Sequence, residues 1–179
     1  KTSVPLRICN VLIKWSKGNP RRLVLALFLA CAVTSSIMSN LSTCIIYLNI
    51  ALSLLKANGC EPRKSNLGRI LMIGLPAISG VGGVMTPAGT PGNLLIMDLL
   101  SSVGVNLTFT QWVILFAPLG LITVFICGIW AKTIFRPETI DDSALQVLNN
   151  KLTECGPLKK KEKNTILIII GMLICWLLG

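Results

Sequence analysis

Two groups of small polar residues, each inside an apolar stretch, are the parts of this sequence best suited to binding ions. The first occupies residues 35–43, in the middle of the uncharged stretch 23–55. The second occupies residues 80–93 and is rich in Gly and Pro, with one Asn. Hydroxyl, amide and carbonyl oxygens suit a hard cation, and N-H groups at helix starts suit an anion. Both groups therefore offer ion binding without a charged side chain.

The cation site is predicted from oxygen atoms at one end of each group. Ser35 and Ser39 are four residues apart and share one face of a helix, and Asn40 adds an amide oxygen. A helix that breaks at Gly82 and Gly83 leaves carbonyl oxygens without helical partners. Oxygen ligands of this kind suit sodium. We therefore predict a sodium site at Ser35, Ser39, Asn40, Gly82 and Gly83.

The anion site is predicted from helix starts. Thr90 followed by Pro91 is typical of an N-cap and a first helical residue, and Ser42 or Thr43 can cap a returning helix in the first group. Each start presents free N-H groups and the positive end of a helix dipole. Together they would bind a carboxylate, sulfate or phosphate. Close helix packing is the alternative role for the small residues of 35–43.

The composition of the sequence indicates that the helices holding these two groups of polar residues belong to a membrane protein. The 179 residues are 53% hydrophobic and 13% charged, with a mean hydropathy of +0.73. The absence of histidine excludes the common dyads and histidine zinc motifs, so we expect no enzyme. The seven cysteines lack a CxxC pair and indicate neither a disulfide framework nor a zinc site.

The formal net charge of +10 comes from 17 Lys and Arg that lie between the apolar stretches and show no regular interleaving with aromatic residues. We therefore expect no nucleic-acid partner. Cytoplasmic loops explain the charge better, because Lys and Arg concentrate there in membrane proteins. The stretch 23–55 has basic residues at both ends, is too long for one span and is too short for two. It predicts a re-entrant hairpin of two half-length helices, and all 17 basic residues then lie on the cytoplasmic side.

The predicted fold class is an all-α membrane protein with a re-entrant hairpin and a broken transmembrane helix. The unwound part of that helix must line protein or a watery cavity. A soluble protein with buried helices is the less favoured alternative. The predicted order is an interfacial amphipathic helix (1–20), a re-entrant hairpin (21–56, tip at 35–43), a cytoplasmic loop (57–69), a broken transmembrane helix (70–105, unwound at 80–93), an intact transmembrane helix (111–132), a cytoplasmic linker (133–163) and the start of a further transmembrane helix (164–179).

From about Pro5 onward, the sequence resembles the divalent anion:sodium symporter family. Ser39-Asn40 resembles the hairpin-tip motif of that family, and Gly89-Thr90-Pro91-Gly92-Asn93 resembles its second motif. Leu41 stands where the first motif has Thr, and Gly92 stands where the second has another Pro. The resemblance supports the sodium ligands above and adds Ser39, Asn40 and Asn93 to the substrate-binding residues.

The resemblance implies one half of an inverted-repeat transporter that carries a small divalent anion, such as a dicarboxylate, citrate or sulfate, together with sodium. The chain starts without Met and ends in an apolar run, so we expect part of a longer, multi-pass cell-membrane protein. Its partners would be the lipid bilayer and the missing second repeat, with a homodimer left open. The alternatives are an anion exchanger, a metal-oxyanion exporter, and a channel or a non-transporting membrane scaffold.

Overall fold

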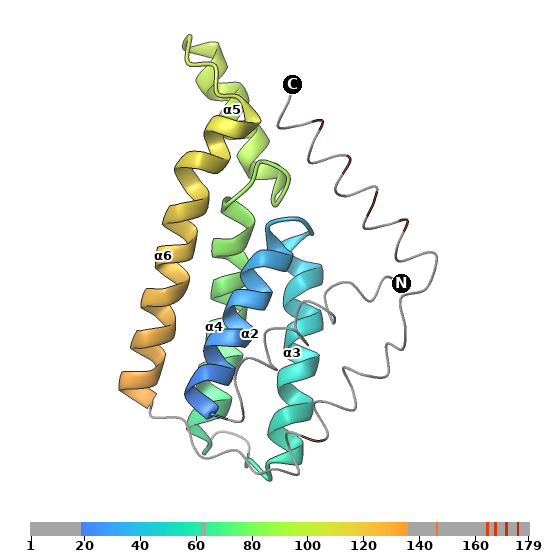
Figure 1. Ribbon diagram of the computed structural model, residues 1–179, viewed down its shortest axis with the longest axis vertical. Coiled ribbons are helices and arrows are strands. Elements are labelled where there is room, and N and C mark those ends of the chain that lie inside the picture. Colours follow the sequence, from blue (N-terminus) through green and yellow to red (C-terminus); the bar gives the residue numbers. More distant parts are fainter. Residues whose placement is uncertain are drawn as a thin grey trace.

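The computed structural model describes residues 19–61 and 64–135, and five isolated positions beyond them. Within these two ranges all regular elements are helices (Figure 1). They are α2 (Pro20–Ser35), α3 (Asn40–Ala57), α4 (Asn66–Val84), α5 (Pro91–Ser102) and α6 (Phe109–Phe135).

Three of these helices, α3, α4 and α6, are long and apolar enough to cross a membrane, and α2 contains a shorter apolar helix, Arg22–Ser35. The 27 residues of α6 correspond to about 40 Å at 1.5 Å per residue. Large apolar side chains such as Leu95, Leu119 and Ile126 are exposed along α5 and α6. A surface of this kind fits lipid or further protein, not water. The predicted all-α membrane fold is therefore confirmed.

Helices α2 and α4 form the centre of the bundle, because they contact each other and both contact α3 and α6. Most side chains from Leu23 to Ala32 are fully buried. The contact with α4 is close because α4 presents glycines: Gly74 lies against the Phe28 ring and Gly82 lies against the backbone of Ala32. A Cβ at either glycine would overlap these neighbours.

Helices α2 and α3 form a hairpin with both outer ends at the same end of the bundle (Figure 1). The Thr34 and Tyr47 hydroxyls, buried between the arms, are 2.9 Å apart and share a hydrogen bond. The turn covers residues 36–39, so the tip is shorter than the predicted 35–43. The arms, of 16 and 18 residues, are also longer than the expected half-length helices. The Ser and Thr residues from 42 onward stay helical because helix packing outweighs their weak preference for turns.

The break between α4 and α5 covers residues 85–90 and is shorter than the predicted 80–93. Gly80, Gly82 and Gly83 lie inside α4, and Asn93 lies inside α5. A glycine costs a helix about 1 kcal/mol relative to alanine. Here the close approach to α2 at Gly82 offsets that cost. Pro87 and the Thr90-Pro91 pair then end one helix and begin the next.

Other predicted boundaries shift by a few residues. Helix α4 already begins at Asn66, inside the predicted loop 57–69, because Ser65 caps α4 by accepting a hydrogen bond from the Gly68 N-H at 3.1 Å. Helix α6 is longer than the predicted 111–132 at both ends. The predictions for residues 1–18 lie outside the described residues. So do those for residues 133–179, apart from 133–135 and a few isolated positions.

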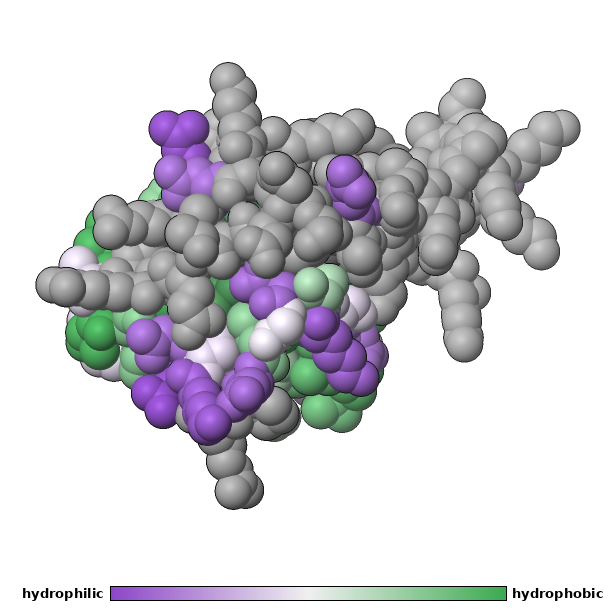
Figure 2. Space-filling model, turned by 90° about the horizontal axis from the view of Figure 1, so that it is seen from below, coloured by the Kyte–Doolittle hydropathy of each residue, from purple (hydrophilic) through white to green (hydrophobic). Residues whose placement is uncertain are grey.

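One end of the bundle carries the basic residues of the described helices and loops. Arg22 lies in the first turn of α2, Lys56 in the last turn of α3, and Lys64 and Arg69 at the start of α4. Figure 2 views this end and shows hydrophilic residues beside apolar ones. The link between α5 and α6, which contains Asn106, lies at the opposite end (Figure 1). We call the end that carries these basic residues the basic end.

Candidate functional site

The hairpin tip meets the break of the α4–α5 pair. The Ser79 hydroxyl, one turn before the end of α4, donates to the backbone oxygen of Asn40 at 2.6 Å. The Thr86 hydroxyl, inside the break, donates to the backbone oxygen of Ser36. The two groups of polar residues identified in the sequence therefore form one junction, which we call the tip–break junction.

Oxygen atoms outnumber the available protons at the centre of this junction. The Ser35 hydroxyl is fully buried and lies 2.8 Å from Asn40 Oδ1 and 2.7 Å from the Ser79 carbonyl oxygen. Its single proton can be donated to only one of these acceptors at a time. The Ser79 hydroxyl oxygen is 3.4 Å from Ser35 Oγ. Such a cluster of uncharged oxygens suits a small hard cation.

Gly83 completes the contact between tip and break. Its Cα lies so close to the Asn40 side chain that a Cβ would overlap the amide group. Gly89, within the break, packs equally closely on the backbone of Gly83. Only glycine allows both approaches. Ser35, Asn40 and Gly83, three of the five predicted sodium ligands, are thus brought together.

The other two predicted sodium ligands are placed differently. Ser39 is exposed at the start of α3. Gly82 lies at the contact with α2, where it allows the two helices to pack closely.

The last carbonyl groups of α4 have donors, contrary to the prediction that they would be unpaired. The Gly82 oxygen accepts from the Met85 N-H at 3.1 Å. The Gly83 oxygen accepts from Asn93 Nδ2 at 2.8 Å, and the Val84 oxygen accepts from Trp112 Nε1 at 3.0 Å. Buried carbonyls require such partners. Each retains a second lone pair that can face a cation.

Asn93 is fully engaged in holding the break. Its side chain is buried, and Nδ2 donates to the carbonyl oxygens of Gly83 and Thr86 at 2.8 and 2.7 Å. An amide has only two N-H donors, so neither remains for an anion. This geometry favours a positioning role for Asn93 over the predicted contact with substrate.

Two helices, α3 and α5, begin at the junction, and the predicted start is correct only for α5. Thr90 is the N-cap of α5 and Pro91 follows it, as expected. Helix α3 begins earlier than expected, with Ser39 as its N-cap, so Ser42 and Thr43 lie inside the helix and do not cap it. Neither the Ser39 nor the Thr90 side chain bonds to its first turn, in contrast to Ser65 of α4.

The remaining residues predicted to bind substrate differ in how exposed they are to solvent. Ser39, Ser42 and Pro91 are exposed, whereas Thr90 is half-buried. Thr43 is fully buried, and its hydroxyl oxygen has no hydrogen-bond partner among the described residues.

The sequence interpretation missed Ser79 and Thr86. A usable signal was present for Ser79, because it lies four residues before Gly83 and so shares a helix face with it. Thr86 gave no comparable signal, because its partner is a backbone oxygen of the other group, 50 residues away. Among the described residues, no group of three Cys, Asp or Glu could hold a metal ion.

In this apolar helical bundle, a helix start and a broken helix share an oxygen-rich junction. Membrane transporters with discontinuous helices have the same arrangement. The chain belongs to the citrate transporter family (CitMHS), which matches residues 1–179. The resemblance to the divalent anion:sodium symporters is also confirmed. This family consists of transporters and not enzymes, as expected.

Similar proteins of known name include transporters of two kinds. The chain is 25% identical to the sodium-dependent dicarboxylate transporter SdcS of Staphylococcus saprophyticus, over 98% of this chain and 35% of that protein. It is 23% identical to the sodium-dependent high-affinity dicarboxylate transporter 3 of Caenorhabditis elegans, over 95% of this chain and 33% of the relative. It is also 23% identical to the citrate/succinate antiporter of Escherichia coli, over 66% of this chain and 25% of that protein. The chain thus spans about a third of these relatives or less.

Proposed function

We propose that this chain is one repeat of a sodium-coupled symporter of small divalent anions, such as dicarboxylates, citrate or sulfate. The single observation that carries the proposal is the tip–break junction, where Ser35, Asn40 and Gly83 meet. Two of the relatives named above are sodium-dependent dicarboxylate transporters, which supports the same substrate class.

Sodium binds at the oxygen cluster in this proposal. Asn40 Oδ1, Ser35 Oγ and the Gly83 carbonyl oxygen would replace part of the hydration shell of the ion. Asn40 Oδ1 and the Ser79 carbonyl oxygen compete for the Ser35 proton, which can go to only one of them at a time. A cation relieves this shortage of protons, because every oxygen can then face a positive charge.

The anion binds at the starts of α3 and α5, next to the cation. Both starts reach Gly83: Asn40, the first residue of α3, packs on it, and Asn93, the third residue of α5, donates to its oxygen. Their N-H groups and helix dipoles favour a carboxylate. A second inverted repeat of the same protein supplies the other half of the site. A homodimer is compatible with this arrangement.

The membrane orientation follows from the basic end. We place Arg22, Lys56 and Arg69 on the cytoplasmic side, in line with the preference of Lys and Arg for that side. The hairpin is re-entrant in this proposal because its tip is polar, and α5 and the start of α6 extend beyond it (Figure 1). The polar tip would then lie within the membrane and face a watery cavity.

An antiporter is the second candidate, because one of the relatives is a citrate/succinate antiporter. The experiment reconstitutes the full-length protein that contains this chain in liposomes and follows the uptake of labelled citrate, succinate and sulfate. An inward sodium gradient should drive saturable accumulation into empty vesicles, and replacing sodium with potassium should abolish it. Uptake that is indifferent to sodium but requires internal dicarboxylate would favour the antiporter and reject symport. Flux that does not saturate would indicate a channel.

A further inference from the structure

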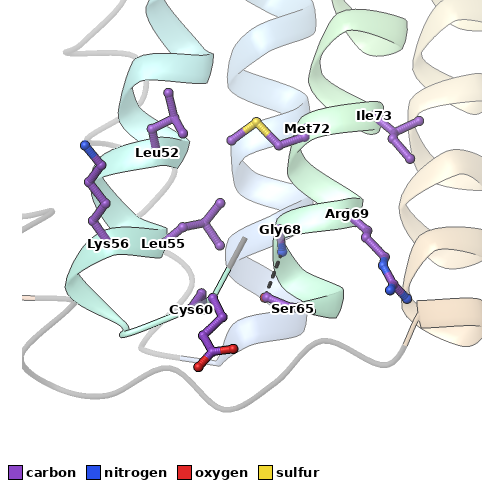
Figure 3. A pocket seen from close by; sticks show the side chains of 10 residues that line it. Leu52, Leu55, Lys56, Cys60, Ser65, Gly68, Arg69, Met72 and Ile73 are labelled. Carbon is purple, nitrogen blue, oxygen red and sulfur yellow. Dashed lines mark hydrogen bonds between the residues drawn. The ribbon is translucent and has the colours of Figure 1, made fainter. Parts of the chain in front are cut away.

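The two ends of α4 are capped in different ways. At its start, Ser65 of the same segment accepts a hydrogen bond from the Gly68 N-H (Figure 3). At its end, a donor comes from another helix: the indole Nε1 of Trp112 in α6 donates to the oxygen of Val84, the last residue of α4, at 3.0 Å. The end of α4 therefore depends on a contact with α6.

The Trp112 side chain is fixed by its surroundings. It is 1% exposed, and its ring lies against the Phe116 ring, with the two centroids 4.4 Å apart. An indole has one donor and no acceptor, and a buried N-H requires a partner. The Val84 oxygen is that partner. The position of this indole and the position of the end of α4 are thus tied together.

Helix α6 also contacts the first residue of the break. Met85 is 4% exposed, and its side chain lies so close to Gly120 that a Cβ there would overlap it. The Met85 N-H donates to the Gly82 oxygen at 3.1 Å. The peptide unit that joins Val84 to Met85 is therefore held on both sides, at its N-H by Gly82 and at its oxygen by Trp112.

This peptide unit follows directly after the one that contains the Gly83 oxygen, which is a ligand in the proposed sodium site. Consecutive peptide planes meet at one Cα, here that of Val84, so a rotation of the second plane is transmitted to the first. The Asn40 side chain packs directly on Gly83. A shift of the Val84 carbonyl would therefore change both the direction of the Gly83 oxygen and the position of the Asn40 amide.

We propose that Trp112 is a positioning residue for the sodium site, an inference that rests on the symport function proposed above. Trp112 does not contact the ion. It acts through Val84, because its N-H fixes the last turn of α4 and with it the Gly83 oxygen. The indole therefore lies beside the site, and its fluorescence reports the arrival of a cation.

The first test is a sodium titration of anion uptake by the full-length protein in liposomes, with whichever of labelled citrate, succinate and sulfate the wild type accumulates. Trp112→Phe keeps an aromatic ring but removes the N-H. The half-saturating sodium concentration should rise about fivefold, the usual effect of one lost hydrogen bond. The maximal rate at saturating sodium should stay close to that of the wild type. Trp130→Phe, the same substitution at an exposed position of the same helix, should change neither quantity.

A second variant separates the hydrogen bond from the packing of the ring. The benzothiophene analogue of tryptophan, incorporated at position 112, keeps the size and shape of the indole but has sulfur in place of the N-H. It should raise the half-saturating sodium concentration as Trp112→Phe does, with a smaller loss of melting temperature. Wild-type sodium dependence in this variant would overturn the proposal, even if Trp112→Phe is unstable.

Tryptophan emission is a readout that a packing role alone would not change. Sodium added to the purified full-length protein without anion should change the emission of the wild type and of Trp130→Phe in a saturable manner, and potassium at the same ionic strength should not. Trp112→Phe should lose most of this change. Equal changes in Trp112→Phe and the wild type would overturn the proposal.

The wild-type titration distinguishes a failure of this inference from a failure of the proposed function. Uptake by the wild type that is indifferent to sodium would reject symport, and the role of Trp112 with it. Sodium-dependent uptake by the wild type, together with an unchanged half-saturating concentration in both variants at position 112, would reject the role of Trp112 alone.

Discussion

The Asn40 side chain, at the first residue of α3, lies directly against Gly83 in the last turn of α4. This contact joins two segments that are 43 residues apart in the sequence (83 minus 40). Ser35 donates to the Asn40 side chain and Asn93 donates to the Gly83 oxygen, so each side of this contact is held by one further residue. The proposed cation site depends on this relationship.

Gly83→Ala is expected to displace the hairpin tip, because the new Cβ would overlap the Asn40 amide. Overpacking of this kind costs about 1–3 kcal/mol. The half-saturating sodium concentration for anion uptake should rise at least tenfold. The measurement is a sodium titration of uptake by the full-length protein in liposomes.

Two glycines of the same helix are matched controls for Gly83. A Cβ at Gly80 meets nothing within 4 Å, so Gly80→Ala should leave both stability and sodium dependence intact. A Cβ at Gly74 overlaps the Phe28 ring, so Gly74→Ala should lower stability without changing the half-saturating sodium concentration. If Gly74→Ala and Gly83→Ala shift sodium dependence equally, the effect of Gly83 is packing alone.

Asn93→Ala should destabilise the break, because the carbonyl oxygens of Gly83 and Thr86 lose their shared donor. The expected loss in the free energy of unfolding is about 2 kcal/mol. Asn93→Asp should cost more, since a carboxylate would face two carbonyl oxygens. Thermal unfolding in detergent measures both, with Asn106→Asp as the exposed control. Equal melting temperatures for Asn93→Ala and the wild type would refute the positioning role.

The topology proposal predicts opposite labelling of two cysteines. Cys60 follows α3 at the basic end, and Asn106 lies in the link at the other end. In a background without other cysteines, an impermeant thiol reagent should modify Cys60 only from the cytoplasmic side. A cysteine introduced by Asn106→Cys should react only from outside. Labelling of Cys60 from outside would exclude the re-entrant hairpin in this orientation.

The 179-residue chain, reconstituted alone, should neither transport nor bind anion with useful affinity. Half of the helix starts and hydroxyl donors of a two-repeat site would be missing. Measurable saturable uptake by this chain would show that one repeat is sufficient. Calorimetric titration of the chain and of the full-length protein with citrate provides the comparison.

The sequence predicted the position of the breaks better than their extent. Pro91 after Thr90 and the turn before Asn40 are encoded locally, by residues with strong preferences for helix starts and turns. The helical state of Gly80 to Gly83 could not be predicted in this way. It depends on the approach of α4 to Ala32 of α2, a tertiary contact that outweighs the local propensity.

The candidate site was likewise predicted in its composition but not in its hydrogen bonds. The hydroxyl and amide residues stand out because they interrupt apolar stretches. Their partners are mostly backbone oxygens, such as those of Ser36, Asn40 and Ser79, which carry no signal in a sequence. The engagement of both Asn93 donors within the break is therefore visible only in three dimensions.

The most direct test of the central claim is a sodium titration of anion uptake in Asn40→Ala of the full-length protein. The substitution removes the amide oxygen that lies 2.8 Å from Ser35 Oγ. Sodium binding should weaken by about 2 kcal/mol, or roughly thirtyfold, and anion binding should weaken with it because coupling between two sites is reciprocal. Ser102→Ala, at the exposed end of α5, is the control and should change little. An unchanged half-saturating sodium concentration in Asn40→Ala would contradict a cation site at the tip–break junction.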